Sequence, residues 1–295
     1  MHMAQHGASA TMRLSKKIAN ILKRGSVMKK IIGGILLSCA FFALASCRKT
    51  AKTGENPVDA LKNRGTFVLG LDASFPPLGF RDNDTNEIVG YDIDLAKEAA
   101  KRLGVSFKAQ PIDWDAKEME LETGKIDCIW NGFTITDERK EALSFTEAYL
   151  NNEQVLVVRA DSGIKTLSDM KGKTLGIQSG SSAQIAVDGN ASFAASVGNT
   201  IYFKDNITAL NDLDIGGVDA VVMDSVVANY SIAQTKKPFV VIDEPLSNEG
   251  YGIGFRKNEG ELRDAVWAVL KEMAADGTVA AISEKWFGKN ISVIK

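Results

Sequence analysis

Apolar runs of strand length alternate with amphipathic stretches of helix length after residue 60, and this alternation restricts the fold more than any other feature. Residues 66–71 have the composition of a buried strand, and residues 91–103 repeat apolar side chains at helical spacing until Gly104 offers a helix stop. Alternating strands and helices form βαβ units, whose strands run parallel. The sequence therefore predicts an α/β fold with mainly parallel sheets flanked by helices. Further strands are predicted at 105–109, 126–130, 174–178, 201–203 and 220–223, and further helices at 116–123, 181–187, 207–215 and 261–275, before a closing segment at 279–287.

One local pattern occurs twice in the chain. LETGKIDCIWN (121–131) and LDIGGVDAVVMD (213–224) share a helix end, a glycine, a β-branched residue, an aspartate and an apolar strand. A chain of 295 residues is long enough for two domains of ordinary size. The repeat therefore predicts two lobes of similar build, although helix–glycine–strand junctions are common enough in α/β chains for a chance similarity.

The first 46 residues differ in composition from the rest, because they hold seven Lys and Arg residues and no acid. Residues 28–30 (MKK) precede an apolar stretch at 31–45, which is typical of an export signal rather than a membrane-spanning helix. LASC, ending at Cys47, resembles the bacterial lipobox, whose cysteine is lipidated. We expect a 1–46 leader with a lipoprotein signal peptide from about residue 28, a lipid anchor on Cys47, a tether at 47–60, and an extracytoplasmic location at the cell surface or in the periplasm. An ordinary cleaved signal that happens to contain Cys47 is the alternative.

Removal of that leader changes the charge balance and the chemistry of the remaining chain. It leaves 28 basic and 37 acidic residues, a net charge of about −9, which argues against nucleic acid as a partner. It also removes every histidine, which excludes histidine catalysis and histidine metal sites. Cys128 lies in an apolar run and is interpreted as a buried small hydrophobe, so no internal disulfide is expected. We predict no metal and no cofactor.

Polar and aromatic residues gather where the predicted strands end. In parallel sheets, ligands bind beyond the carboxyl ends of the strands. A zwitterion could use each residue type found there: Arg139 offers two parallel N–H donors to a carboxylate, residues 180–182 open a helix with free N–H groups, and Asp224 can pair with an ammonium. Asp72 is a second candidate partner for the ammonium, the aromatic residues would form an apolar wall, and Asn131 and Thr134 would supply the polar part of that wall. The candidate ligand-binding residues are Asp72, Phe75, Trp114, Asn131, Gly132, Phe133, Thr134, Arg139, Gly180, Ser181, Ser182 and Asp224.

Each of these residues also has an ordinary structural interpretation. Arg139, within DERK, could lie on a solvated helix face, and Asp224 could cap the helix that begins at residue 225. Ser181 and Ser182 are common helix-start residues, and aromatic side chains beside strands usually belong to the core. Their convergence on one edge of the predicted sheets favours a site.

These residues lie in motifs that resemble the polar amino-acid-binding members of the family-3 solute-binding proteins of bacterial ABC importers. The resemblance runs from about residue 65 to 287. It implies a type II periplasmic-binding-protein fold in which two lobes, joined by two hinge crossovers, enclose a free amino acid, and whose closed form docks on an ABC permease. The matching stretches are VLGLDASFPPLGF, IVGYDIDLAKEAAKRLG, GKIDCIWNGFTITDERK, LSFTEAYL, MKGKTLGIQSGSSA, VDAVVMDSVVANY, YGIGFRKNEGEL and MAADGTVAAISEKWFG.

The resemblance also implies roles and boundaries. Arg139 is expected to hold the ligand's α-carboxylate and Asp224 its α-amino group. Lobe 1 is expected at 61–150 plus 251–295 and lobe 2 at 151–250, in a protein that acts as a monomer. No residue pairs unambiguously with a basic ligand side chain, although Asp92 and Asp113 lie near in sequence. We therefore prefer a neutral polar, aromatic or sulfur-containing amino acid.

Two other classes of function remain open. Some relatives of this fold are enzymes, such as a cyclohexadienyl dehydratase, and an acid in the cleft could serve as a general acid or base. The protein could also be a sensor or adhesin whose pocket has degenerated. We expect a binding protein rather than an enzyme.

Overall fold

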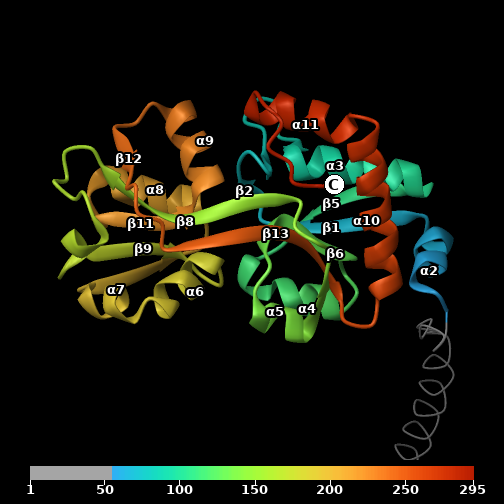
Figure 1. Cartoon of the computed structure of the whole chain (residues 1–295), viewed down its shortest axis with the longest axis horizontal. Helices are drawn as coiled ribbons and strands as arrows, with labels where there is room; N and C mark the ends of the chain where they lie inside the picture. Colours follow the sequence, from blue (N-terminus) through green and yellow to red (C-terminus); the bar gives the residue numbers. More distant parts are fainter. Residues whose placement is uncertain (1–54) are drawn as a thin grey trace, which may run out of the picture. The chain divides into compact units, whose positions relative to one another are not determined.

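The computed structural model describes residues 55–295 (Figure 1). The predicted signal peptide, the predicted lipidation site Cys47 and the predicted tether up to residue 54 lie outside the described residues. Residues 57–60, which the sequence assigned to the tether, are helical: Asn56 accepts a hydrogen bond from the Val58 N–H at 2.8 Å, and Pro57 occupies the first turn of α2 (Pro57–Arg64). Within the described part, no helix is both long and apolar enough to cross a membrane.

A ten-stranded sheet runs through the described part of the chain. β1 pairs in parallel with β5 and β6, and β9 pairs in parallel with β10 and β11. Between these two groups lie β8 and β13, which pair antiparallel with each other. The spatial order is β10 (Asn199–Phe203), β9 (Thr174–Gln178), β11 (Ala220–Asp224), β8 (Leu150–Arg159), β13 (Ser247–Arg256), β6 (Cys128–Thr134), β1 (Thr66–Leu71) and β5 (Ser106–Pro111).

Helices cover both faces of each half of the sheet, as Figure 1 shows. α8 and α9 cover one face of the half that contains β9, and α6 and α7 cover the other. In the half that contains β1, α3 and α11 lie opposite α4 and α5, and α10 packs against α3 and α11. The bounds are α3 (Tyr91–Leu103), α4 (Lys117–Glu122), α5 (Asp137–Ala142), α6 (Ser182–Gly189), α7 (Ala191–Ser196), α8 (Asn206–Ile215), α9 (Ser225–Thr235), α10 (Gly260–Ala275) and α11 (Thr278–Phe287), with 3-10 turns at Trp114–Ala116 and Leu167–Met170. Smaller strands are β2 (Ser74–Phe75), β3 (Gly79–Arg81), β4 (Ile88–Val89), β7 (Leu143–Phe145) and β12 (Phe239–Val241).

β8 and β13 link the two halves, and neither was among the strands predicted from the sequence. The first part of β8 pairs with β13, and its later part pairs with β11. The first part of β13 likewise pairs with β8, and its later part pairs with β6. The lobe boundaries predicted at 150/151 and 250/251 fall inside these two strands, and that division stays a prediction.

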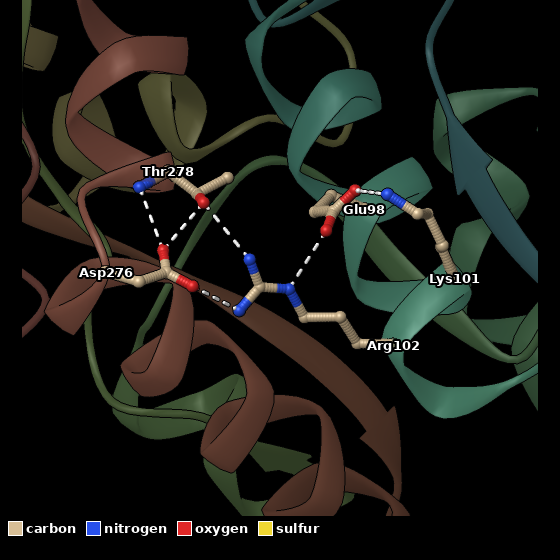
Figure 2. Close-up of polar contacts among 5 residues, drawn as sticks. All are labelled: Glu98, Lys101, Arg102, Asp276 and Thr278. Atoms are coloured by element: carbon tan, nitrogen blue, oxygen red, sulfur yellow. Dashed lines mark hydrogen bonds and ion pairs between the residues drawn. The ribbon is translucent and has the colours of Figure 1, made fainter.

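The C-terminal helices return to the half that contains α3, where polar contacts fasten them. Arg102, in the last turn of α3, donates from Nη1 to Asp276 Oδ2 at 2.7 Å and from Nη2 to Thr278 Oγ1 at 3.1 Å (Figure 2). Its Nε donates to Glu98 Oε1 at 3.0 Å. α3 has the predicted bounds, and it ends at Leu103 because Gly104 adopts φ 77° and its N–H bonds to the carbonyls of Ala100 and Lys101.

Candidate functional site

A small cavity lies between the two halves, at the carboxyl ends of the parallel strands. One half contributes residues after β1 and β5 and residues in and after β6, and the other contributes residues at or after the ends of β9 and β11. The free space is about 10 Å³, about enough for one water molecule. No molecule much larger than water fits in this space as the structure stands. The lining residues are Asp72, Phe75, Trp114, Asn131, Gly132, Arg139, Gln178, Ser181, Ser182 and Asp224.

Arg139 reaches this cavity from α5. Thr136 caps that helix, because its Oγ1 accepts a hydrogen bond from the Arg139 N–H at 3.1 Å. This places the Arg139 side chain on the inner side of the first turn. The guanidinium donates to the carbonyls of Thr134 at 2.9 Å and Gly180 at 3.5 Å, and its Cζ lies 4.4 Å from the centre of the Phe133 ring. Burial lowers the pKa of the guanidinium. Arg139 is 8% exposed, which rules out a solvated helix face, and no carboxylate within residues 55–295 forms an ion pair with it.

Asp224 ends β11 on the opposite side of the cavity and is 3% exposed. Its Oδ1 accepts hydrogen bonds from Tyr251 OH at 2.7 Å, Asn152 Nδ2 at 2.7 Å and Gln154 Nε2 at 2.9 Å. Burial raises the pKa of Asp224 to about 7, and the nearby Glu249 carboxylate adds to the shift. Among the described residues, no side-chain donor bonds to Oδ2 and no cation pairs with Asp224. Asp224 does hold the N-cap position of α9, but its side chain makes no capping hydrogen bond.

Asp72 is a second buried carboxylate on the cavity wall. Its Oδ2 accepts from Gln178 Nε2 at 2.8 Å, across the two halves, and its Oδ1 accepts from the Ser74 N–H at 2.9 Å. The Asp72 N–H donates to Asn131 Oδ1 at 3.0 Å. Burial raises the pKa of Asp72, whereas the bond from Gln178 lowers it. Gln178 was not among the candidates, although its position at the end of β9 is the signal that identified the others.

The aromatic candidates divide into two groups. Phe75 and Trp114 line the cavity. Phe133 does not, because it is fully buried beneath the Arg139 guanidinium, 5.7 Å from Trp114 and 5.1 Å from Phe145 between ring centres. Phe133 therefore supports Arg139 rather than facing the cavity.

Thr134 and Gly180 border the cavity without lining it. Thr134 Oγ1 lies 3.0 Å from Ser182 Oγ and donates to Glu249 Oε2 at 2.8 Å. Glu249 also accepts from Gln154 Nε2 at 3.0 Å, so it shares a donor with Asp224. The sequence analysis did not identify four further polar residues on β8 and β13, namely Asn152, Gln154, Glu249 and Tyr251. Polar residues inside two segments of strand length were the available signal that these segments contribute to the site.

The remaining acidic candidates do not reach the cavity wall. Asp92 is fully buried behind it, where Oδ2 accepts from the Gly132 N–H and from Tyr149 OH, each at 2.9 Å. Asp113 is exposed. Within residues 55–295, no group of three or more His, Cys, Asp or Glu side chains is placed to hold a metal. The arrangement can hold a small zwitterion, because a buried guanidinium and a buried carboxylate meet one cavity from opposite sides.

A cavity of this kind between two sheet-based halves that share two linking strands defines a two-lobed periplasmic binding protein of type II. The model of the bacterial extracellular solute-binding proteins, family 3, matches residues 67–289, and the chain belongs to that family. This finding confirms the family resemblance and the fold predicted from the sequence.

Several relatives carry names that refer to amino acids. The chain is 32% identical over 240 residues to the L-cystine-binding protein TcyJ of Escherichia coli (strain K12), with 81% of this chain and 88% of that protein covered. A crystal structure of a substrate-binding protein of an ABC uptake transporter from Streptococcus pneumoniae with bound histidine is similar at 36% identity and a TM-score of 0.78, covering 80% of this chain and 97% of that one. The ancestral amino acid-binding protein AncCDT-1, described as a precursor of cyclohexadienyl dehydratase, is similar at 35% identity and a TM-score of 0.72, covering 78% and 99%.

Proposed function

We propose that this protein is the substrate-binding component of an amino acid ABC importer and captures one free amino acid between its lobes by hinge closure. Arg139 holds the α-carboxylate, assisted by the N–H groups at the start of α6, where no side chain makes a capping bond. Asp224 holds the α-ammonium through its free Oδ2. The side chain of the ligand lies against Asp72, Phe75 and Trp114.

One observation carries this proposal. Arg139 and Asp224 are both buried, neither has an ion-pair partner within residues 55–295, and both line the same cavity. Burying an unpaired charge is unfavourable by several kcal/mol, of the order of 3–5 kcal/mol where a partner has been removed. A zwitterion supplies both missing partners at once, which neither a simple anion nor a simple cation does.

The ligand we propose is a neutral polar, aromatic or sulfur-containing amino acid. The polar wall of Asn131 and Gln178 and the aromatic wall of Phe75 and Trp114 suit such side chains. The relatives whose names or titles mention cystine and histidine make these two amino acids the first to test. Asp72 could instead pair with a basic side chain, and binding of L-arginine or L-lysine alone would contradict our preference.

A thermal-shift screen of the amino acids tests the function. A ligand present at about 100 times its dissociation constant stabilises the folded protein by about 2.7 kcal/mol, enough to raise the melting temperature measurably. Isothermal titration calorimetry then gives the affinity and the stoichiometry, which we expect to be one. No shift with any amino acid would favour a sensor or adhesin with a degenerate pocket.

The proposed location follows from the leader. We propose that Cys47 carries a lipid that anchors the protein on the outer side of a membrane, where it works as a monomer with its ABC permease. Mass spectrometry of the N-terminal peptide of the exported protein measures the lipid, and an unmodified Cys47 would leave a cleaved, unanchored form.

An enzyme on the same scaffold is the second candidate, and the raised pKa of Asp224, about 7, is the observation that favours it. We propose binding without turnover, because Asp224 is held on Oδ1 by three donors and faces a cavity that an ammonium would complete. Mass spectrometry of the ligand recovered after long incubation separates binding from turnover. An unchanged mass supports binding alone, whereas the loss of water or carbon dioxide from the ligand supports an enzyme.

A further inference from the structure

Lys117 is a second buried cation beside the carboxylate end of the proposed site. It is the first residue of α4 and is 4% exposed. Its Nζ donates to the carbonyl of Gly180 at 3.1 Å and to the carbonyl of Trp114 at 3.2 Å. Gly180 belongs to the half that contains β9, whereas Lys117 and Trp114 belong to the other. The bond to Gly180 therefore exists only while the two halves are together.

Lys117 and Arg139 share that carbonyl. Arg139 Nη2 donates to the Gly180 carbonyl oxygen at 3.5 Å, so two cations from one half converge on a single neutral oxygen of the other. The acid paired with Lys117 is Glu118, at 3.4 Å, and the Glu118 side chain is 39% exposed and therefore partly screened by water. Burial lowers the pKa of the Lys117 ammonium, the Glu118 carboxylate partly opposes this shift, and the positive charge of Arg139 adds to it.

This arrangement is unfavourable when the cavity is empty. Closing the halves without a ligand takes two like charges out of water, with no buried carboxylate paired to either among residues 55–295. Closing them on a carboxylate supplies the missing negative charge in a setting of low dielectric, where its attraction for both cations is strong.

We propose that Lys117 is a positioning residue that makes closure of the two lobes conditional on an α-carboxylate in the cavity. Lys117 lines an adjoining pocket of about 490 Å³ together with Arg139, Gly180 and Ser181, and it does not line the cavity itself. It acts through the Gly180 carbonyl and through its charge beside Arg139. The inference rests on the proposed function and adds a selection rule: the protein selects a ligand with a free carboxylate over its neutral amide.

The test compares an amino acid with its own carboxamide. Lys117→Met keeps the apolar stem and removes the charge. In the unmodified protein we expect the acid to bind more tightly than the amide. In Lys117→Met we expect the affinity for the acid to fall about tenfold, the equivalent of about 1.4 kcal/mol. The affinity for the amide, measured by competition, should not fall, because the amide brings no negative charge for Lys117 to attract. Lys117→Arg should restore the discrimination.

Two further readouts separate this role from simple support of the α4 region. The empty Lys117→Met protein should have a smaller radius of gyration by X-ray scattering than the unmodified empty protein, because the charge that opposes empty closure is gone. Its melting temperature should not fall. Lys125→Met is the matched control, since Lys125 follows α4 in the chain, 61% of its side chain is exposed, and it pairs only with Glu120 among the described residues.

The outcomes are distinct. If an amino acid binds but Lys117→Met keeps the unmodified ratio of acid to amide affinity, the inference is overturned and the proposed function stands. Equal losses for acid and amide together with a lower melting temperature would assign Lys117 a structural role and also overturn it. If no amino acid binds the unmodified protein, the proposed function fails and the inference falls with it.

Discussion

At the scale of single residues, Arg139 is the most direct test of the carboxylate end of the site. Arg139→Ala removes the planar donor fork, so we expect the affinity for the amino acid to fall at least 100-fold, about 3 kcal/mol, which lies within the range for a lost charged partner. Calorimetric titration measures the loss. The fold should persist, because Arg139 has no ion pair to lose within residues 55–295.

Lys140→Ala is the matched control for that change. Lys140 is the next residue of α5, 52% of its side chain is exposed, and it pairs with Asp137 at 2.7 Å. Its loss should leave binding unchanged. Equal affinities in the two alanine variants would remove Arg139 from the site.

Asp224 predicts a pH dependence. Its pKa is raised from 3.8 to about 7 in the folded protein, so the folded state holds a proton that the unfolded chain loses. This contribution to stability is complete below about pH 4 and is lost as the pH rises through about 7. The ammonium of a ligand needs the ionised form. Affinity should therefore decrease below about pH 7, approaching tenfold per pH unit.

Asp224→Asn separates this effect from the other buried acids. The empty variant should be more stable than the unmodified protein at pH 8 by thermal unfolding, while binding is lost. Asp92, whose pKa is also raised to about 7 by burial, is present in both proteins and its contribution cancels. A stability profile between pH 5 and 8 with the same slope in both proteins would contradict the assignment.

The sequence identified much of the cavity wall but not the residues that pack behind it or bond to it. Arg139, Asp224 and Asp72 could be predicted because each follows a strand in a parallel sheet, and such positions share one edge. Phe133 could not be placed, because its orientation depends on the backbone of Gly132. Gln154 lies opposite Asp224 in the pairing of β8 with β11, 70 positions away, and Glu249 is brought there by the pairing of β13 with β8, so no local pattern records these contacts.

At the scale of elements, the ends marked by glycine were predictable and the linking strands were not. α3 was located because Gly104 stops it, whereas the strand predicted at 126–130 runs as β6 from Cys128 to Thr134. The extension contains Gly132 at φ 57°, in the left-handed region that favours glycine. Its N–H bonds to the buried Asp92, which fixes this turn against α3.

Gly132→Ala tests that turn. A Cβ at this position would lie 2.7 Å from Phe75 Cε1 and 2.7 Å from Leu78 Cδ1, so the change displaces a cavity residue. We expect destabilisation by about 2–4 kcal/mol from backbone strain and overpacking, together with weaker binding. Gly124→Ala is the control, because Gly124 has φ 75° with open space around it and should lose only about 1 kcal/mol. Chemical denaturation measures both, and equal losses would mean that the crowding at Gly132 is relieved without effect.

At the scale of the two lobes, closure involves contacts outside the cavity. Phe80, in β3 of one half, lies 6.2 Å between ring centres from Tyr230, in α9 of the other, and 5.9 Å from Trp286 of its own half. Neither Phe80 nor Tyr230 lines the cavity. Because the cavity holds only about 10 Å³ of free space, we expect a ligand to enter an opened form in which this aromatic pair is separated and to be enclosed when the pair forms again.

Tyr230→Ala removes the aromatic contact without touching the site. An aromatic pair contributes about 0.5–1.5 kcal/mol, so closure should weaken and the dissociation constant should rise about 2- to 13-fold. Surface plasmon resonance should place this change in the dissociation rate, since the open form still admits the ligand freely. Tyr202→Ala, at an exposed position of the same half, should behave like the unmodified protein. A slower association with an unchanged dissociation rate would show instead that Tyr230 acts on entry of the ligand rather than on the closed state.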